Sequence, residues 1–152
     1  MKKTIAGMLA LLLSVGLAHA ADAGRVWKNP SCGCCKSWIK HMNGHGFALD
    51  VTEVDQSALE AVKRENGIGA EHASCHTARI GGYVIEGHVP APLVKRLLTE
   101  KPDAVGLAVP GMPAGSPGME TGGASEDYDV LLIKKDGTSD VFEHVTADTP
   151  QP

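Results

Sequence analysis

The sequence predicts a single mixed α/β domain in which helices flank one sheet. Two observations predict this class. Segments that alternate apolar and polar residues, as half-buried strands do, take turns with segments whose apolar residues recur at helical spacing, and glycine or proline separates them. The expected order is strand–helix–strand–helix–strand–strand–helix, which is that of a thioredoxin-like domain. Its segments are 25–28, 35–43, 47–54, 57–65, 77–80, 83–86 and 90–100.

The first three elements are predicted from their ends and their apolar faces. The strand over 25–28 ends at Asn29-Pro30-Ser31. Apolar side chains recur on one face of the helix over 35–43, and two glycines shortly after it favour its termination. Residues 47–54 alternate apolar and polar side chains, which indicates a strand.

The next elements carry turn and capping signals. Ser57 lies near the start of the helix over 57–65, and Glu60 follows three residues later, a pattern that predicts a capping box. Gly81-Gly82 separates two short strands and predicts a hairpin. Pro90-Ala91-Pro92 then opens a further helix, because proline is favoured in the first helical turn.

The C-terminal part of the chain changes in composition. Glycine and proline interrupt residues 106–123 every few positions, so we expect an irregular loop there. Residues 128–134 and 138–144 read as two strands around Lys135-Asp136-Gly137. The sequence therefore predicts a Gly/Pro-rich loop followed by a β-hairpin extension of the domain.

The N-terminus has the pattern of a secretory signal peptide. Lys2 and Lys3 precede an apolar run over 5–17, and Ala18-His19-Ala20 supplies the small residues of a cleavage site. The run is shorter than the roughly 20 residues of a membrane span, so we expect export to the periplasm without membrane insertion after cleavage. The predicted divisions are a signal peptide at 1–20, one domain at 25–145 and a flexible tail at 146–152.

The charge of the chain bears on its partners. The formal net charge is −4 at pH 7, and cleavage of the signal peptide would make the chain more acidic. No run of basic residues follows. Because contacts to phosphates require clustered lysine and arginine, the sequence argues against a nucleic-acid partner and against adhesion to anionic lipid.

Four cysteines suggest chemistry rather than two structural disulfides. Cys32, Cys34 and Cys35 lie within four residues, and Cys75 is far along the chain. Adjacent cysteines such as Cys34 and Cys35 rarely bridge each other, because the bond geometry strains the peptide between them.

Two chemistries remain open for the cysteine cluster. Cys32 and Cys35 form a C-x-x-C pair at a helix N-terminus, where the helix dipole favours a redox-active thiolate. Alternatively, the thiolates together bind a soft metal ion such as Cu(I).

Three details favour metal. Cys34 is a third thiol inside the C-x-x-C pair, where it would offer a redox enzyme the wrong partner but could bridge metal ions. Thioredoxin-like redox enzymes carry a cis-proline before their third strand, yet this chain has no proline from 36 to 89. That loop instead contains Cys75 and His76, which the fold would bring beside the cluster. Further donors are plentiful, and we include His41, His88, Met112 and Met119 among the candidate ligands. His45, His72 and His144 are interpreted as ordinary polar residues, and Trp27 and Trp38 as core residues.

The motifs resemble those of the periplasmic copper-resistance proteins of the CopG type. The matching stretches cover most of the chain from about 26 to 128, and they are Cys32-Gly33-Cys34-Cys35, Cys75-His76-Thr77, Tyr83 to Pro90, Gly106 to Pro113 and Ser116 to Glu120. The resemblance implies a thioredoxin-like fold, several copper ions held by the cysteines with help from histidine, and a role in copper tolerance. It also implies interconversion of Cu(I) and Cu(II).

The leading hypothesis is a periplasmic protein that binds copper for resistance and homeostasis. Its candidate metal ligands are Cys32, Cys34, Cys35, Cys75, His41, His76, His88, Met112 and Met119. The same soft donors would also accept silver. Two alternatives stay open: a thiol–disulfide oxidoreductase that uses Cys32 and Cys35, and a copper chaperone that delivers to an efflux or oxidase partner.

Overall fold

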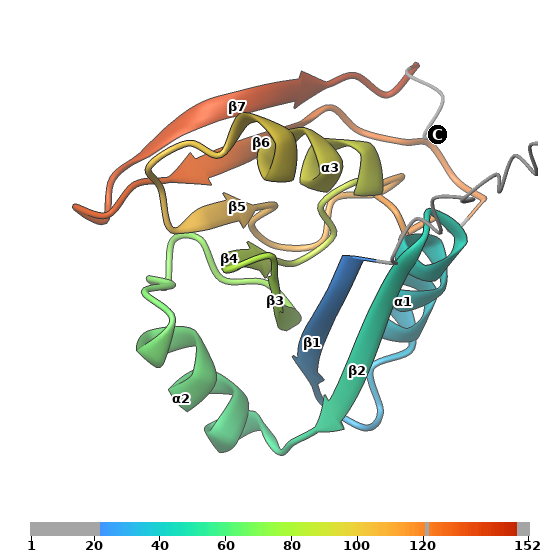
Figure 1. Cartoon of the computed structure of the whole chain (residues 1–152). Coiled ribbons are helices and arrows are strands. Elements are labelled where there is room, and N and C mark those ends of the chain that lie inside the picture. The colour runs from blue at the N-terminus through green and yellow to red at the C-terminus, as the bar shows by residue number, and fades with distance from the viewer. Residues whose placement is uncertain (1–21, 121, 149–152) are drawn as a thin grey trace, which may run out of the picture.

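The computed structural model describes residues 22–120 and 122–148. The predicted signal peptide over 1–20 and most of the predicted tail over 146–152 lie outside these residues. The elements follow the predicted order, with one strand added (Figure 1). They are β1 (Asp22–Lys28), α1 (Gly33–Gly44), β2 (Phe47–Glu53), α2 (Gln56–Glu65), β3 (His76–Ile80), β4 (Tyr83–Glu86), α3 (Ala91–Glu100), β5 (Gly106–Ala108), β6 (Tyr128–Ile133) and β7 (Ser139–Val145).

Seven strands in the described part of the chain form one mixed sheet in the order β2-β1-β3-β4-β5-β6-β7. β1 pairs in parallel with β2 and antiparallel with β3, and β3 and β4 form the hairpin expected around Gly81-Gly82. The predicted α/β class with a mixed sheet and flanking helices is confirmed, and the arrangement from β2 to β4 is consistent with a thioredoxin-like domain.

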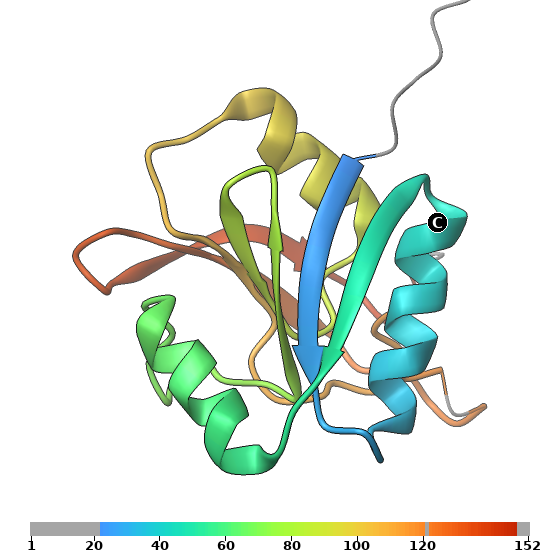
Figure 2. The same cartoon turned by 60° about the horizontal axis from the view of Figure 1, so that its bottom comes forward.

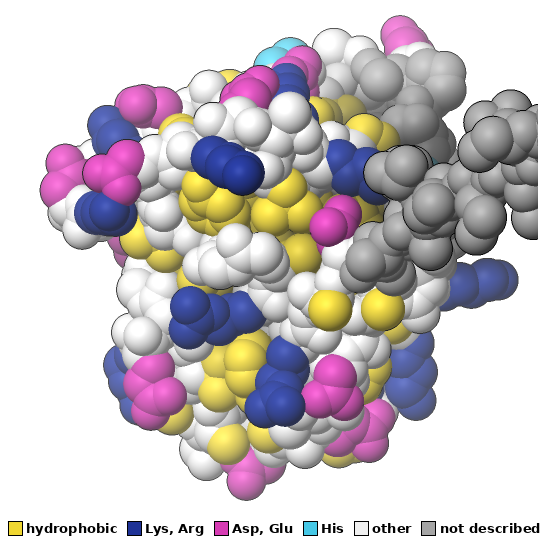
Figure 3. All heavy atoms as spheres, viewed as in Figure 1, with side chains coloured by type: hydrophobic (Ala, Val, Ile, Leu, Met, Phe, Trp, Pro, Cys, Tyr) yellow, Lys and Arg dark blue, Asp and Glu magenta, His cyan; other side chains and the backbone are white. Residues whose placement is uncertain are grey.

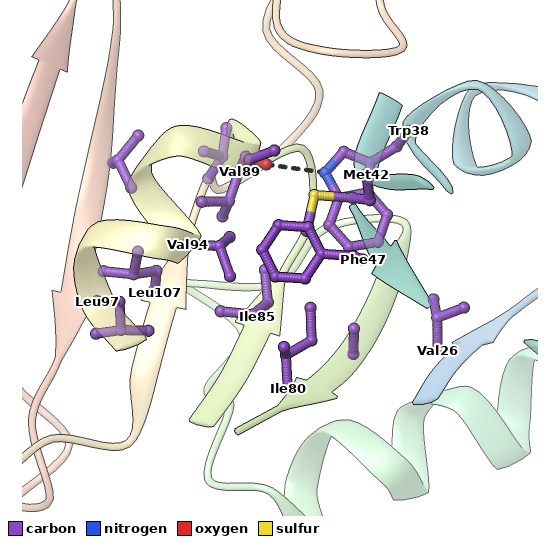
Figure 4. Close-up of a cluster of buried hydrophobic side chains, with 14 of the residues drawn as sticks. Val26, Trp38, Met42, Phe47, Ile80, Ile85, Val89, Val94, Leu97 and Leu107 are labelled. Atoms are coloured by element: carbon purple, nitrogen blue, oxygen red, sulfur yellow. Dashed lines mark hydrogen bonds between the residues drawn. The ribbon is translucent and has the colours of Figure 1, made fainter. Parts of the chain in front are cut away.

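Helices cover the two faces of the sheet unequally. α1 and α3 share the larger apolar core with Ile80 and Ile85, whereas the neighbouring Val84 points to the opposite face and a smaller cluster around Ile68. α2 lies apart from α1 and α3 (Figures 1 and 2). Figure 4 shows Trp38, Met42 and Phe47 packed toward α3. The indole Nε1 of Trp38 donates to the carbonyl of Val89 at 2.9 Å, which ties α1 to the segment before α3.

β5 is the element that the sequence did not predict. It pairs in parallel with β4 and antiparallel with β6, so it joins the C-terminal hairpin to the main sheet. Its three residues are too few for a periodic pattern. Its first residue, Gly106, lies so close to β4 that a Cβ atom at this position would collide with the backbone of Val84.

Two helix starts also differ from the prediction. α1 begins at Gly33 rather than Cys35, with Cys32 as its N-cap. The capping box at Ser57 is wrong: Asp55 caps α2, and its carboxylate accepts from the backbone N–H of Ala58 at 2.9 Å. Aspartate is among the strongest N-cap residues, and it lies early enough for its side chain to reach the free N–H groups.

The described residues contain no helix that combines the length and the apolar character of a membrane span. Figure 3 shows the face seen in Figure 1, where basic and acidic side chains are interspersed and apolar side chains are exposed between them.

Candidate metal centre

The turn between β1 and α1 carries three of the four cysteines. The N–H of Cys32 donates to the carbonyl of Asn29 at 3.0 Å, which closes the turn. Cys32 then caps the helix, because its Sγ accepts from the N–H of Cys35 at 3.2 Å. Cys34 and Cys35 follow in the first turn of α1. The helix start therefore places all three sulfurs at one end of the sheet.

Cys32 and Cys35 are joined by a disulfide, with their Cα atoms 5.4 Å apart. Cys34 and Cys75 are free thiols. The C-x-x-C pair is thus geometrically able to bond, while Cys34 between its two members stays outside the bond. This arrangement leaves the thiol–disulfide alternative open beside the metal hypothesis.

Cys75 lies in the loop before β3, as the sequence predicted, and its sulfur meets the cluster. The Sγ atoms of Cys34 and Cys75 are 3.9 Å apart, and those of Cys32 and Cys34 are 3.5 Å apart. All four sulfurs lie within 4.8 Å of one another. Burial and then the nearby Cys34 raise the pKa of the Cys75 thiol to about 12, so a metal ion must displace its proton on binding. The depressed pKa expected of thiols at a helix N-terminus does not extend to Cys75, which lies in another loop.

Two buried histidines approach the same cysteine. The Sγ of Cys75 lies 3.3 Å from Nδ1 of His76 and 3.0 Å from Nε2 of His88. These three donor atoms form a second group within 4.8 Å of one another. Both imidazoles are fully buried. Cys75 therefore belongs to two overlapping sets of donors.

The ring of His88 is oriented by the Gly/Pro-rich loop. Its Nδ1 lies 2.8 Å from the carbonyl oxygen of Pro117. Because a carbonyl only accepts, Nδ1 carries the proton and Nε2 presents its lone pair to Cys75. Burial lowers the pKa of His88, against the opposing effects of the Pro117 carbonyl and the Glu120 charge. The sequence did not reveal this contact of Pro117, because the group that accepts from His88 is a backbone carbonyl rather than a side chain.

His76 is held between aromatic rings. Its centroid lies 4.3 Å from that of Trp38 and 5.1 Å from that of His88. Complete burial lowers its pKa well below the ordinary value, and the charges of His88 and Lys63 act in the same direction. Its Nε2 has no hydrogen-bond partner among the described residues. The ring is therefore neutral, and its polar contact is directed at Cys75.

The Gly/Pro-rich loop lies against the start of α1. Gly118 has φ +91°, and a Cβ atom there would lie 2.7 Å from the N of Trp38 and 2.8 Å from the carbonyl oxygen of Cys34. Glycine thus allows the loop to pass over the helix end that carries the cysteines. Met112 is 52% exposed and Met119 is half-buried. Their assignment as ligands stays a prediction.

His41 lies outside both donor groups. Its Nε2 accepts from the N–H of Ala91 at 3.1 Å. Ala91 is the first residue of α3, whose N-cap Pro90 provides no side-chain cap, so His41 satisfies a free N–H at that helix end. The structure therefore gives His41 a structural partner and does not bring it to the sulfurs.

His41 predicts a pH dependence of stability. Burial, followed by the charge of His45, lowers its pKa from 6.5 to about 4. Between these values the unfolded chain binds a proton that the folded chain does not, so the stability contributed by neutral His41 is lost as the pH falls from 6.5 toward 4. We expect the free energy of unfolding to fall less steeply over this range in His41→Gln than in the parent protein, measured by urea denaturation.

His144 provides a control of opposite sign. A hydrogen bond to Asp129 raises the pKa of this exposed histidine, so its contribution is present below 6.5 and lost as the pH rises. His144→Gln should therefore lose stability on acidification at least as steeply as the parent. If the free energy of unfolding falls equally steeply with pH in His41→Gln and in the parent, the role given to His41 is contradicted.

A buried ion pair, missed by sequence reasoning, supports the Cys75 loop. Lys63 Nζ lies 2.5 Å from Oε1 of Glu86, which is completely buried. The same Glu86 oxygen accepts from the N–H of Ser74 at 2.7 Å, and its Oε2 accepts from Thr77 at 2.7 Å. Burial raises the pKa of Glu86, and the Lys63 ammonium opposes that shift. The sequence carried one signal that Lys63 is buried. Lys63 follows the apolar Leu59 by four residues and therefore lies on the same face of the helix.

Comparisons with known proteins agree with this site. A family model described as "Protein of unknown function, DUF411" matches residues 72–119, which include Cys75, His76 and His88. A search of curated proteins found no match. The solved structure "Copper resistance protein copG- Form 2" is 42% identical, covers 82% of this chain and 98% of its own, and has a TM-score of 0.75.

A second solved structure, "Copper resistance protein copG- Form 1", is 40% identical. The match covers 83% of this chain and 98% of that chain, with a TM-score of 0.76. The resemblance inferred from the motifs is thereby confirmed, and the chain belongs to the family of the copper resistance protein CopG.

Proposed function

We propose that this protein binds copper outside the cytoplasm and holds Cu(I) between the thiolates of its four cysteines, with His76 and His88 as nitrogen donors. The observation that supports this most strongly is the convergence of four sulfurs within 4.8 Å, one of which also contacts two buried imidazoles. The copper-resistance names of the similar structures suggest the same metal. The predicted signal peptide supports a periplasmic location.

The chemistry of the donors favours Cu(I). Thiolate sulfur is soft and selects Cu(I), and sulfurs 3.5 and 3.9 Å apart are close enough to bridge neighbouring ions. Neutral imidazole also accommodates Cu(II). In this proposal copper is the cargo of the protein, and silver, another soft ion, would compete for the same sulfurs.

The Cys32–Cys35 pair also supports interconversion of Cu(I) and Cu(II). Two Cu(II) ions would each accept one electron, while the two thiols lose two protons and form one disulfide. The products are two Cu(I) ions, two protons and the bond that joins Cys32 to Cys35. The reverse direction would oxidise Cu(I) at the expense of the disulfide.

Anaerobic titration of the fully reduced protein with Cu(I) tests the binding proposal. Competition with a chromophoric Cu(I) chelator measures the number of ions bound and their affinity. We expect more than one equivalent with a Kd below micromolar. Less than one equivalent at that affinity would rule out the proposed function.

Thiol–disulfide exchange remains a second candidate because the Cys32–Cys35 disulfide is at a helix N-terminus and Cys32 is partly exposed. This candidate predicts turnover of a disulfide substrate and a trapped mixed disulfide in Cys35→Ser. If Cys34→Ser keeps full exchange activity and copper has no effect, exchange is the better description. Delivery of copper to an efflux or oxidase partner is a third candidate, which direct transfer between purified proteins would identify.

A further inference from the structure

We propose that Cys75, His76 and His88 form a metal site that persists when Cys32 and Cys35 are joined, so that the disulfide form retains one copper ion while the reduced form holds several. This inference rests on the proposed function and adds a regulation to it. The state of one cysteine pair would set how many ions the protein holds.

The two donor sets differ in their dependence on the disulfide. The first set consists of the four sulfurs, and the Cys32–Cys35 bond removes two of them as thiolate ligands. The second set is Cys75, His76 and His88, and the bond removes none of these donors. Cys75 is the atom common to both. Oxidation therefore dismantles the sulfur cluster but leaves the second set intact.

The second set has nearly the spacing of a bound ion. Bonds of about 2.3 Å to sulfur and about 2.0 Å to nitrogen at a tetrahedral angle separate the two donor atoms by about 3.5 Å. The observed separations from the Cys75 sulfur are 3.3 Å to His76 and 3.0 Å to His88. Movements of a few tenths of an ångström would admit an ion. The chain holds these donors in place by burial and by secondary structure.

Both imidazoles are prepared for ligation. The Pro117 carbonyl fixes the proton of His88 on Nδ1 and so leaves Nε2 free toward Cys75. His76 directs Nδ1 to the same sulfur, and its fully buried Nε2 has no other partner among the described residues. Ligation of a metal ion through Nδ1 would leave the proton of the neutral ring on Nε2.

The donor types indicate which ion this site would take. Two imidazoles and one thiolate form a mixed nitrogen and sulfur set, which supports both Cu(I) and Cu(II). The sulfur cluster, by contrast, favours Cu(I) alone. Forming the disulfide from two cluster thiolates releases two electrons, which two Cu(II) ions can accept to become Cu(I); the thiol protons have already left when the cluster bound copper. The retained site would then hold one ion while the former cluster releases the rest.

The experiment compares Cu(I) stoichiometry in two forms of the same protein under anaerobic conditions. One form is fully reduced, and the other carries the Cys32–Cys35 disulfide, verified by two free thiols before and after titration. We expect more than one equivalent in the reduced form and one equivalent in the disulfide form.

Histidine variants separate the proposed site from nonspecific binding. His88→Ala should lose the equivalent in the disulfide form, whereas His144→Ala, an exposed histidine paired with Asp129, should keep it. The inference is overturned if the disulfide form binds no copper, if it binds as many ions as the reduced form, or if His88→Ala keeps the equivalent. Failure of the reduced form to bind would instead overturn the proposed function.

Discussion

Replacement of Cys75 with serine is expected to lower the affinity for Cu(I) by more than about 100-fold, a larger loss than for either cysteine of the disulfide. Changes to groups that only support a metal ligand already cost about 10- to 100-fold, and Cys75 is proposed as a direct ligand. Its sulfur is the one atom shared by the two donor sets. A serine hydroxyl is a hard, neutral donor that Cu(I) binds poorly.

The matched control is Cys34→Ser, the same replacement at the neighbouring free thiol. It should lower the capacity of the reduced protein but leave one equivalent in the disulfide form, where Cys75→Ser should leave none. Chelator competition measures both variants, and urea denaturation confirms that each is folded. Equal copper binding by Cys75→Ser and the parent would contradict the placement of Cys75 at the centre of the site.

Lys63→Met is expected to lower the free energy of unfolding by about 3 kcal/mol, because it removes one partner of a buried ion pair. Glu86 would remain completely buried with its charge no longer compensated. Urea denaturation of the reduced, metal-free protein at pH 7 measures the effect. Lys40→Met changes an exposed lysine on α1 in the same way, and we expect its effect to stay within about 0.5 kcal/mol.

A double variant tests whether the loss comes from the unpaired charge. In Lys63→Met with Glu86→Gln, the buried group is neutral and can still accept from Ser74. We therefore expect the double variant to be more stable than Lys63→Met alone. Simple addition of the two single effects would show that Lys63 and Glu86 act independently, against the direct contact between them.

The fold was predictable where local patterns were strong. The alternation in β2 and the glycines between β3 and β4 predicted these elements nearly to the residue. β5 was not predictable, because three residues in a Gly/Pro-rich stretch acquire their structure from β4 and β6 rather than from their own pattern. The N-cap of α2 was misplaced because two acceptors, Asp55 and Ser57, precede the same helix.

The site was predictable as far as the fold order determined it. The order of elements brings Cys75 and His76 to the cysteine turn, and the structure shows this convergence. His41 shares a helix with the cysteines, but it lies six residues beyond Cys35, about 9 Å along the axis, and caps α3 instead. The Lys63–Glu86 pair was missed because charged side chains are usually exposed, and only tertiary packing shows that these two are buried.

β5 has a further consequence for any shortened form of the protein. If the chain ended before Gly106, β4 would become an open edge of the sheet, with unpaired N–H and carbonyl groups beside the apolar Val84 and Ile85. Such edges recruit strands from other molecules and lead to aggregation. The C-terminal hairpin is therefore also a protective cover, and the part that resembles a minimal thioredoxin-like domain should not be expected to remain monomeric without it.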